Sequence, residues 1–148
     1  FYNNKAYEAA LEVYEPLYPL LKHKPEFLFE AAQSLSKTGQ YEKANEYLER
    51  AVLLSSDPML YYVMAKNEQC LGEYRQAEKH LLHAIDILPE RIYPYYLLMN
   101  LYTEPSYFQP AKLKMAIDSV LTKKPKVESS AIKEMKEKAR SMLNNTSI

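Results

Sequence analysis

The 148-residue sequence has little glycine and cysteine and no tryptophan: it contains two glycines and one cysteine. So few glycines leave little material for β-hairpin turns or phosphate-binding loops. The single Cys70 cannot form an internal disulfide, so the cysteine content does not indicate whether the protein resides in an oxidising or a reducing compartment. No apolar run approaches the roughly 20 residues that a membrane-spanning helix needs, and the first residues do not resemble a signal peptide. The composition therefore predicts a folded all-α domain.

The sequence also lacks an excess of charge of either sign, because 19 Lys and Arg balance 19 Asp and Glu. Up to residue 110 there are 10 basic and 15 acidic residues, and from residue 111 there are 9 and 4. A zero total argues against a nucleic-acid partner, which usually needs a basic face. We interpret the basic C-terminal part as a solvated helix face, and contact with acidic lipid or protein is the alternative.

Motifs of known catalytic chemistry are missing too, such as G-x-S-x-G, H-E-x-x-H or a glycine-rich phosphate loop. His80 and His83 could share a metal ion, but a third ligand would have to come from Glu73 or Asp86, so we interpret them as helix-surface residues. No base lies near Cys70 in sequence, and we interpret it as a small, buried or half-buried filler. We therefore expect no cofactor, no metal and no enzymatic activity in this chain.

A repeated set of residues is the most informative feature of the sequence. Identical residues recur 33 positions apart, in the pairs Pro25/Pro58, Gly39/Gly72, Tyr41/Tyr74, Ala44/Ala77, Leu48/Leu81 and Ala51/Ala84. A period of this length indicates stacked units of two helices each. The alanines are expected where paired helices approach closely, and the glycines where a helix ends in a left-handed residue.

Helical periodicity predicts seven or eight helices, at about residues 4–15, 26–38, 41–54, 58–71, 74–88, 91–103, 110–123 and 129–143. Pro16 and Pro19 are expected to kink or end the first helix near Tyr14, followed by an irregular turn. Asp57, and Ser129 or Ser130, are expected to cap the helices that follow them. Two prolines within residues 104–110 predict an extended loop.

These elements predict one domain over residues 1–148. It consists of a partial repeat (1–24), two repeats (25–57 and 58–90), a degenerate repeat (91–127) and a capping helix (128–148). Since the chain starts inside a repeat and without methionine, we expect it to be part of a longer protein.

Residues Pro25 to Arg91 resemble the tetratricopeptide repeat, a helix-turn-helix unit of 34 residues. The Gly-x-Tyr-x-x-Ala turn and the terminal alanine match fully, whereas Leu28 and Tyr61 replace the family's usual Trp. The resemblance implies an α-α superhelix, or solenoid, of antiparallel helix pairs. Its concave face would be lined by the first helix of each unit.

The same resemblance places a partner-binding groove on those first helices. Its positions correspond to Glu26, Phe29, Gln33, Ser36, Met59, Tyr62, Lys66, Gln69, Tyr93, Tyr96, Asn100 and Thr103. In chaperone-binding members a Lys and Asn clamp begins where Phe29 and Gln33 stand, so we expect a peptide with apolar anchors instead. Phe29, Tyr62 and Tyr96 would form an aromatic ladder, and Tyr62→Ala is expected to weaken binding while sparing the fold. Alternatively, these residues only face water or another part of the parent protein.

A second resemblance covers Arg91 to Leu143, which contains R-I-Y-P-Y-Y-L-L and K-K-P-K-V-E-S-S-A-I-K-E-M-K. This segment is similar to the C-terminal repeat region of bacterial membrane proteins of the O-antigen ligase or polymerase class. Those proteins hold their active site in the membrane part, so the resemblance implies a non-catalytic interaction scaffold in the bacterial envelope. A glycan-binding module using some of the 14 tyrosines, and a generic cytoplasmic scaffold, are the alternatives; the membrane side and oligomeric state stay open.

Overall fold

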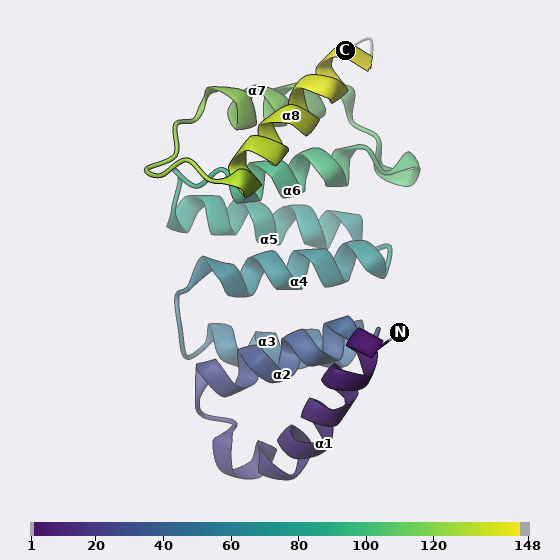
Figure 1. Ribbon diagram of the computed structural model, residues 1–148, viewed down its shortest axis with the longest axis vertical. Coiled ribbons are helices and arrows are strands. Elements are labelled where there is room, and N and C mark those ends of the chain that lie inside the picture. Colours follow the sequence, from purple (N-terminus) through teal and green to yellow (C-terminus); the bar gives the residue numbers. More distant parts are fainter. Residues whose placement is uncertain (1, 146–148) are drawn as a thin grey trace. The chain divides into compact units, whose positions relative to one another are not determined.

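The computed structural model describes the backbone of residues 2–145 and the side chains of residues 4–145. Within that range the chain forms eight α-helices and one short 3-10 helix, with no β-strand (Figure 1). The predicted all-α fold class is therefore confirmed. Backbone contacts divide the chain into two compact units, unit 1 (Phe1–Glu73) and unit 2 (Tyr74–Ile148).

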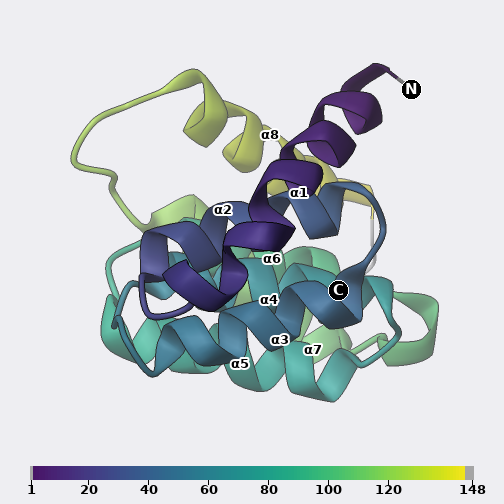
Figure 2. The ribbon, with the colours of Figure 1, turned by 90° about the horizontal axis from the view of Figure 1, so that it is seen from below.

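Unit 1 consists of α1 (Tyr2–Leu21), α2 (Pro25–Lys37), α3 (Tyr41–Val52) and α4 (Pro58–Cys70). Helices α2 and α3 form a closely packed pair, α4 packs against α3, and α1 packs against α2. Figure 2 shows α1 running obliquely across α2. These boundaries agree with the predicted helices to within two residues, except at α1.

Of the two outcomes predicted for the first helix, a kink or an end near Tyr14, the end does not occur, because α1 continues through Pro16 and Pro19 to Leu21. The two prolines are three residues apart, so they share one face of the helix, and both are exposed. Carbonyl groups left without an N–H partner on that side can bond to water instead. On the other side, Leu17 and Leu21 pack against the core of unit 1, which stabilises the helical conformation beyond the prolines.

Both glycines occupy the predicted left-handed positions, with φ of 83° at Gly39 and 77° at Gly72. After α2, the Gln40 N–H donates to the Leu35 carbonyl at 2.8 Å and the Gly39 N–H donates to the Ser36 carbonyl at 3.1 Å. The same two bonds recur after α4, which is the Schellman pattern of helix termination. Asp57 caps α4 as predicted, since its carboxylate accepts from the Met59 N–H at 2.9 Å.

The alanines lie where the sequence predicts close helix contacts: Ala44, Ala51 and Ala84 have no exposed surface and Ala77 is 1% exposed. Ala44 and Ala51 belong to the core of unit 1, together with Leu28, Leu35 and Leu48. Small side chains at these positions let the backbones of the paired helices approach.

Replacing Ala44 with leucine is expected to lower the free energy of unfolding by about 1–3 kcal/mol, because the added carbons have no space between the helices. The measurement is urea unfolding followed by far-ultraviolet circular dichroism. The Ala111→Leu variant is the control, because Ala111 is exposed on a helix and should tolerate leucine. Equal stability of the Ala44→Leu variant and the wild type would contradict the close packing of α3.

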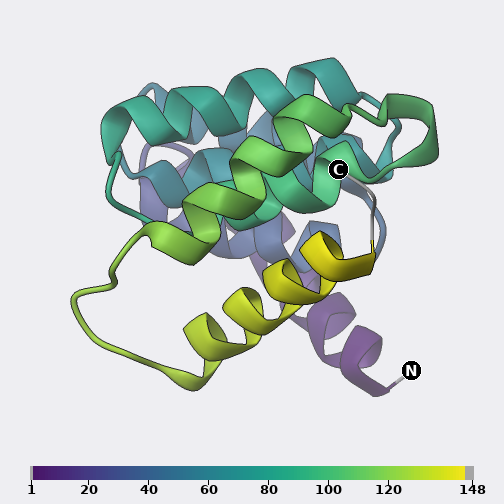
Figure 3. The ribbon, with the colours of Figure 1, turned by 90° about the horizontal axis from the view of Figure 1, so that it is seen from above.

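Unit 2 consists of α5 (Tyr74–Ile87), α6 (Tyr93–Tyr102), η1 (Pro105–Tyr107), α7 (Pro110–Thr122) and α8 (Ser130–Asn145). Helix α6 packs against both α5 and α7, and its Met99 and Leu101 are fully buried. Figure 3 shows the long connection between α7 and α8. The predicted extended loop over residues 104–110 is instead partly ordered, because Pro105–Tyr107 forms a 3-10 turn.

Helix α8 packs against α7, with a smaller contact to α6. The Ile132 N–H donates to the Ser129 hydroxyl, so Ser129 rather than Ser130 caps the helix. The Lys136 ammonium donates to the carbonyls of Val120, Leu121 and Lys123 at 2.9, 3.2 and 2.9 Å. A cation at these carbonyls satisfies the otherwise unpaired end of α7 and complements its dipole. No helix in residues 2–145 is both long enough and apolar enough to cross a membrane.

Candidate functional site

An open depression of about 350 Å³ lies between α2 and α4 in unit 1. We call it the acidic hollow, and its lining residues are Pro25, Glu26, Phe29, Glu30, Ser55, Asp57 and Leu60. The repeat produces it, since α2 and α4 are equivalent helices that each begin with a proline at the first helical position. Three of the lining residues are carboxylic acids, and none is Lys, Arg or His.

The apolar side of the acidic hollow is rigid. Phe29 is half-buried and packs against the core of unit 1, and Leu60 belongs to that core. One carboxylate is oriented from α1, because the Tyr14 hydroxyl donates to Glu30 Oε2 at 3.4 Å. Burial raises the pKa of Tyr14, and the Glu30 charge and this hydrogen bond raise it further, so Tyr14 remains a donor at neutral pH.

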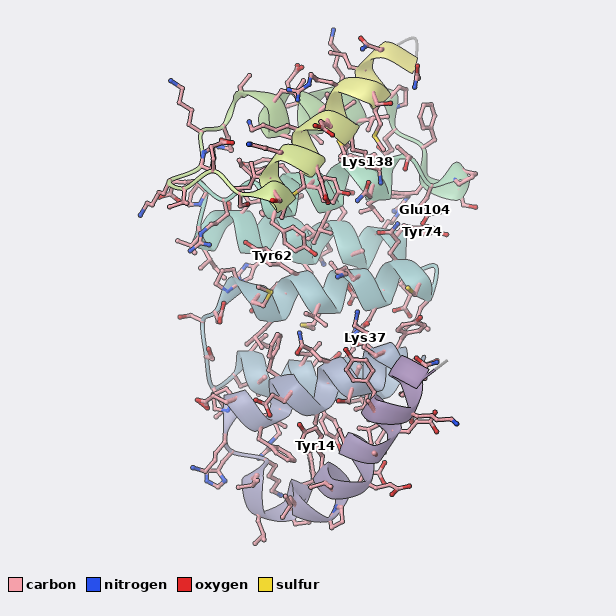
Figure 4. The ribbon with its side chains drawn as sticks, in the orientation of Figure 1. Tyr14, Lys37, Tyr62, Tyr74, Glu104 and Lys138 are labelled. Carbon is pink, nitrogen blue, oxygen red and sulfur yellow. The ribbon has the colours of Figure 1, made fainter. Side chains whose placement is uncertain are left out.

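The Tyr14 side chain, labelled in Figure 4, belongs to α1. Its ring meets that of Phe27 on α2 edge-on, with 5.8 Å between the ring centres. Asp57 is fixed by its capping bond, and Glu26 extends from the first turn of α2. The acidic hollow therefore presents fixed negative charge beside an aromatic ring. Such a site suits a cation with an aliphatic stem, as in Lys or Arg.

The predicted groove residues of unit 1 differ in accessibility. Gln33, Met59 and Lys66 are exposed and Gln69 is partly exposed, as a binding surface requires. Tyr62, however, is only 5% exposed. Truncating Tyr62 would remove buried packing, so the expectation that Tyr62→Ala spares the fold is corrected.

The predicted groove residues of unit 2 are partly covered. Tyr93 and Tyr96 stack with 6.4 Å between ring centres. The ammonium of Lys138, which Figure 4 labels on α8, lies 5.5 Å from the centre of the Tyr96 ring. Asn100 is half-buried, and its backbone carbonyl accepts from the Thr103 hydroxyl at 2.7 Å. A partner peptide would therefore have to compete with Lys138 of α8 for the ring of Tyr96, one of the predicted aromatic anchors. The ladder of Phe29, Tyr62 and Tyr96 includes residues of both units and stays a prediction.

A buried carboxylate in unit 2 was not predicted. Glu78 of α5 is 8% exposed and accepts hydrogen bonds from Tyr102 at 2.6 Å and Tyr107 at 2.5 Å. The Lys112 ammonium of α7 lies 2.9 Å from Glu78 Oε2, the oxygen that also accepts from Tyr102, whereas Tyr107 donates to Oε1. Tyr107 also stacks on Tyr74 and Tyr102, with 5.8 and 6.5 Å between ring centres. Glu78 thus joins α5, α6, the 3-10 turn and α7.

Two opposing effects set the pKa of Glu78. Burial alone would raise it, but the hydrogen bonds from Tyr102, Tyr107 and Lys112, with the Lys112 charge, lower it below the ordinary value. Burial and the bond to Glu78 raise the pKa of both Tyr102 and Tyr107. All three groups therefore keep their usual charge states at neutral pH.

Sequence reasoning could have found Glu78 from its position. It lies four residues after Tyr74 and three before Leu81, in the buried stripe of α5. A charged residue within an apolar stripe predicts a buried partner. The partners could not be identified, because Tyr107 and Lys112 come from the segment where the repeat pattern fails.

A second buried polar contact, between α3 and α4, was also missed. The Asn67 amide donates to Asn45 Oδ1 at 2.8 Å, and the Asn45 amide donates to the Met64 carbonyl at 3.3 Å. Both asparagines are buried, so they satisfy each other within unit 1.

Cys70 and the pair His80 and His83 were the remaining candidates for chemistry in the sequence. Cys70 is exposed at the end of α4 rather than buried, because helix α4 turns it away from the core of unit 1. In the part of the chain that the structure describes, no three His, Cys, Asp or Glu side chains are grouped closely enough to hold a metal ion.

Comparison with known proteins supports the repeat assignment. Residues 3–84, more than half of the chain, match the profile of the family described as anaphase-promoting complex, cyclosome, subunit 3. Tetratricopeptide repeat protein 21A of Mus musculus is 35% identical over 86 residues. That alignment covers 58% of this chain and 6% of the mouse protein, so the chain spans only a small part of this relative.

Solved structures show the same fold at low sequence identity. A crystal structure of MamA has a TM-score of 0.72 and 20% identity, with 91% of this chain and 77% of that chain covered. MamA from Desulfovibrio magneticus RS-1, residue 41 to the end, has a TM-score of 0.67 and 18% identity, with 92% and 70% covered. Together with the glycine-terminated helix pairs, the profile match shows that the chain is a tetratricopeptide-type repeat protein and belongs to the family described as anaphase-promoting complex, cyclosome, subunit 3.

Proposed function

We propose that the protein is a non-catalytic scaffold that binds a partner polypeptide at the acidic hollow, with a Lys or Arg side chain of the partner beside Phe29. One observation carries this proposal: three carboxylates and an aromatic ring line a depression that has no Lys, Arg or His among its lining residues. Phe29 and Glu26 also occupy groove positions expected from the repeat. A protein partner is in keeping with the name of the matching family, which describes a subunit of a complex.

The acidic hollow suits a basic side chain for two physical reasons. The stem of Lys or Arg can lie on the partly exposed Phe29, while its charged end meets the three carboxylates of the hollow. Because these carboxylates are exposed, each ion pair is expected to contribute only about 0.5 kcal/mol. Affinity then depends on several contacts, including the exposed Met59 on α4.

A glycan is the second candidate partner, because sugar sites also combine an aromatic face with carboxylates. Phe29 between Glu26 and Glu30 offers such a combination. The half-buried Phe29 leaves less of its ring for stacking than a sugar platform needs. We therefore favour the polypeptide.

The parent protein and its location are further proposals. The similarity of Arg91–Leu143 to O-antigen ligase or polymerase repeat regions suggests the soluble part of a bacterial envelope protein, and a cytoplasmic scaffold is the alternative. The full-length reading frame tests this proposal. Membrane spans with ligase motifs upstream would support it, and a parent without any membrane span would contradict it.

Charge-neutralising substitutions test the acidic hollow. In the Glu26→Gln, Glu30→Gln, Asp57→Asn triple variant the oxygen that caps α4 is retained, so the fold should persist. We expect peptides with a central Lys or Arg to bind this variant about tenfold more weakly than the wild type. The loss of three ion pairs, each worth about 0.5 kcal/mol, corresponds to about that factor in affinity. The measurement is fluorescence anisotropy with a peptide array varied at the central residue.

The matched control is the Glu42→Gln, Glu46→Gln, Glu49→Gln variant, which makes a similar change of charge on the exposed side of α3. Its affinity should equal that of the wild type. Equal losses in both variants would indicate a non-specific charge effect. Binding of oligosaccharides without binding of any peptide would instead favour the glycan.

A further inference from the structure

A second hollow, of about 440 Å³, lies in unit 2 and has the opposite charge. We call it the basic hollow, and its lining residues are Arg75, Glu78, Lys79, Tyr107, Gln109 and Lys112. It forms between α5, the segment after η1 and the start of α7. The irregular connection of residues 104–109, which replaces the short glycine turn of the earlier repeats, supplies one wall.

The charges around the basic hollow do not cancel. Glu78 contributes one negative charge, and Lys112 compensates it through the 2.9 Å ion pair. Arg75 and Lys79 are exposed. Neither takes part in an ion pair with a carboxylate in the described part of the chain. The hollow therefore has three cations and one anion, which leaves two positive charges without a partner.

The framework of the basic hollow is fixed before any ligand arrives. Both Glu78 oxygens already accept hydrogen bonds from within unit 2. The Tyr107 ring lies against those of Tyr74 and Tyr102 in stacked orientations. The buried carboxylate therefore holds the walls in place, and the cations at the rim are left to face solvent. A preorganised site loses less conformational entropy on binding.

We infer that the basic hollow binds a phosphorylated serine or threonine of a partner polypeptide. Two uncompensated positive charges match a phosphoryl group, which carries about −1.5 to −2 charges at neutral pH. A carboxylate would leave one cation unmatched. The Arg75 guanidinium can bind two phosphate oxygens side by side, and Lys79 adds a second positive charge, with the Gln109 amide as a neutral donor.

This site goes beyond the proposed function, because it involves other helices and a ligand of opposite charge. A basic segment at the acidic hollow and a phosphorylated segment at the basic hollow could belong to one partner or to two. Each site can be disabled without touching the other. The net charge of zero argues against a nucleic acid as the source of the phosphate.

The test uses the full 148-residue chain and three synthetic pentapeptides, in which glycines flank phosphoserine, serine or glutamate. Two-dimensional NMR titration should show saturable shifts at Arg75, Lys79 and the Gln109 side-chain amide with the phosphoserine peptide only. The Arg75→Gln, Lys79→Gln variant should bind that peptide about tenfold or more weakly, since each charge-assisted hydrogen bond is worth roughly that factor. Raising the salt concentration should weaken binding to the wild type.

The Lys114→Gln variant is the matched control, because Lys114 is an exposed lysine of α7 that does not line the hollow. It should bind like the wild type. Unchanged affinity of the Arg75→Gln, Lys79→Gln variant would overturn the inference. So would equal binding of the glutamate peptide, or shifts that spread over all lysines without saturation. Failure at the acidic hollow would leave these results unaffected.

Discussion

Replacing Glu78 with alanine is expected to lower the free energy of unfolding by about 3 kcal/mol, because three donors lose their shared acceptor. Tyr102 is 4% exposed, so its hydroxyl cannot regain a full water shell. The substitution also releases Tyr107, and with it the 3-10 turn. Urea unfolding followed by tyrosine fluorescence is a direct measurement, since the chain has 14 tyrosines and no tryptophan.

The Glu78→Gln variant separates the contribution of charge to stability from that of hydrogen bonding, since glutamine keeps an acceptor oxygen and a similar shape. Because the folded pKa of Glu78 lies below its ordinary value of 4.5, its stabilisation is present above pH 4.5 and is lost as the pH falls through the folded pKa. The wild type should therefore lose more stability between neutral pH and that acid range than the Glu78→Gln variant. Parallel pH profiles would show that Glu78 is not held ionised by its partners.

Replacing Leu48 with alanine is expected to lower the free energy of unfolding by about 3 kcal/mol, through lost burial and a residual cavity. Leu48 has no exposed surface and lies in the core of unit 1 among residues of α2 and α3. Leu48 is also one of the residues that recur with the 33-residue period of the repeat. The same urea titration gives the value, provided that the slope of free energy against urea concentration is unchanged.

The matched control is Leu53→Ala, which deletes the same atoms five residues later. Leu53 is 83% exposed, so little stability should be lost. Similar losses for the two variants would contradict the placement of Leu48 in the core. A loss confined to Leu48→Ala would confirm that the repeated positions form the interior.

The sequence predicted the features that depend on residues close together in the chain. The positions of the α-helices followed from helical periodicity, and both left-handed turns followed from Gly39 and Gly72. The buried alanines followed from their recurrence. In each case the physical cause is local: backbone conformation at one residue, or one face of one helix.

The candidate sites were predicted only in part, because they depend on which distant side chains meet. Repeat positions indicated Phe29 and Glu26, but the carboxylates of Glu30 and Asp57 completed the acidic hollow only in three dimensions. The basic hollow was not predicted at all. Its walls come from the irregular segment before α7, for which the repeat offered no template.

The sequence by itself determined a chain of paired helices, where each pair ends and which faces are buried, because spacing along a helix fixes which residues share a face. Only the tertiary structure decided that α1 continues through Pro16 and Pro19, since packing of Leu17 and Leu21 outweighs the lost hydrogen bonds. It alone also decided that Glu78 stays ionised within unit 2. Tyr102, Tyr107 and Lys112 supply the donors, and they lie 24, 29 and 34 residues away in the chain.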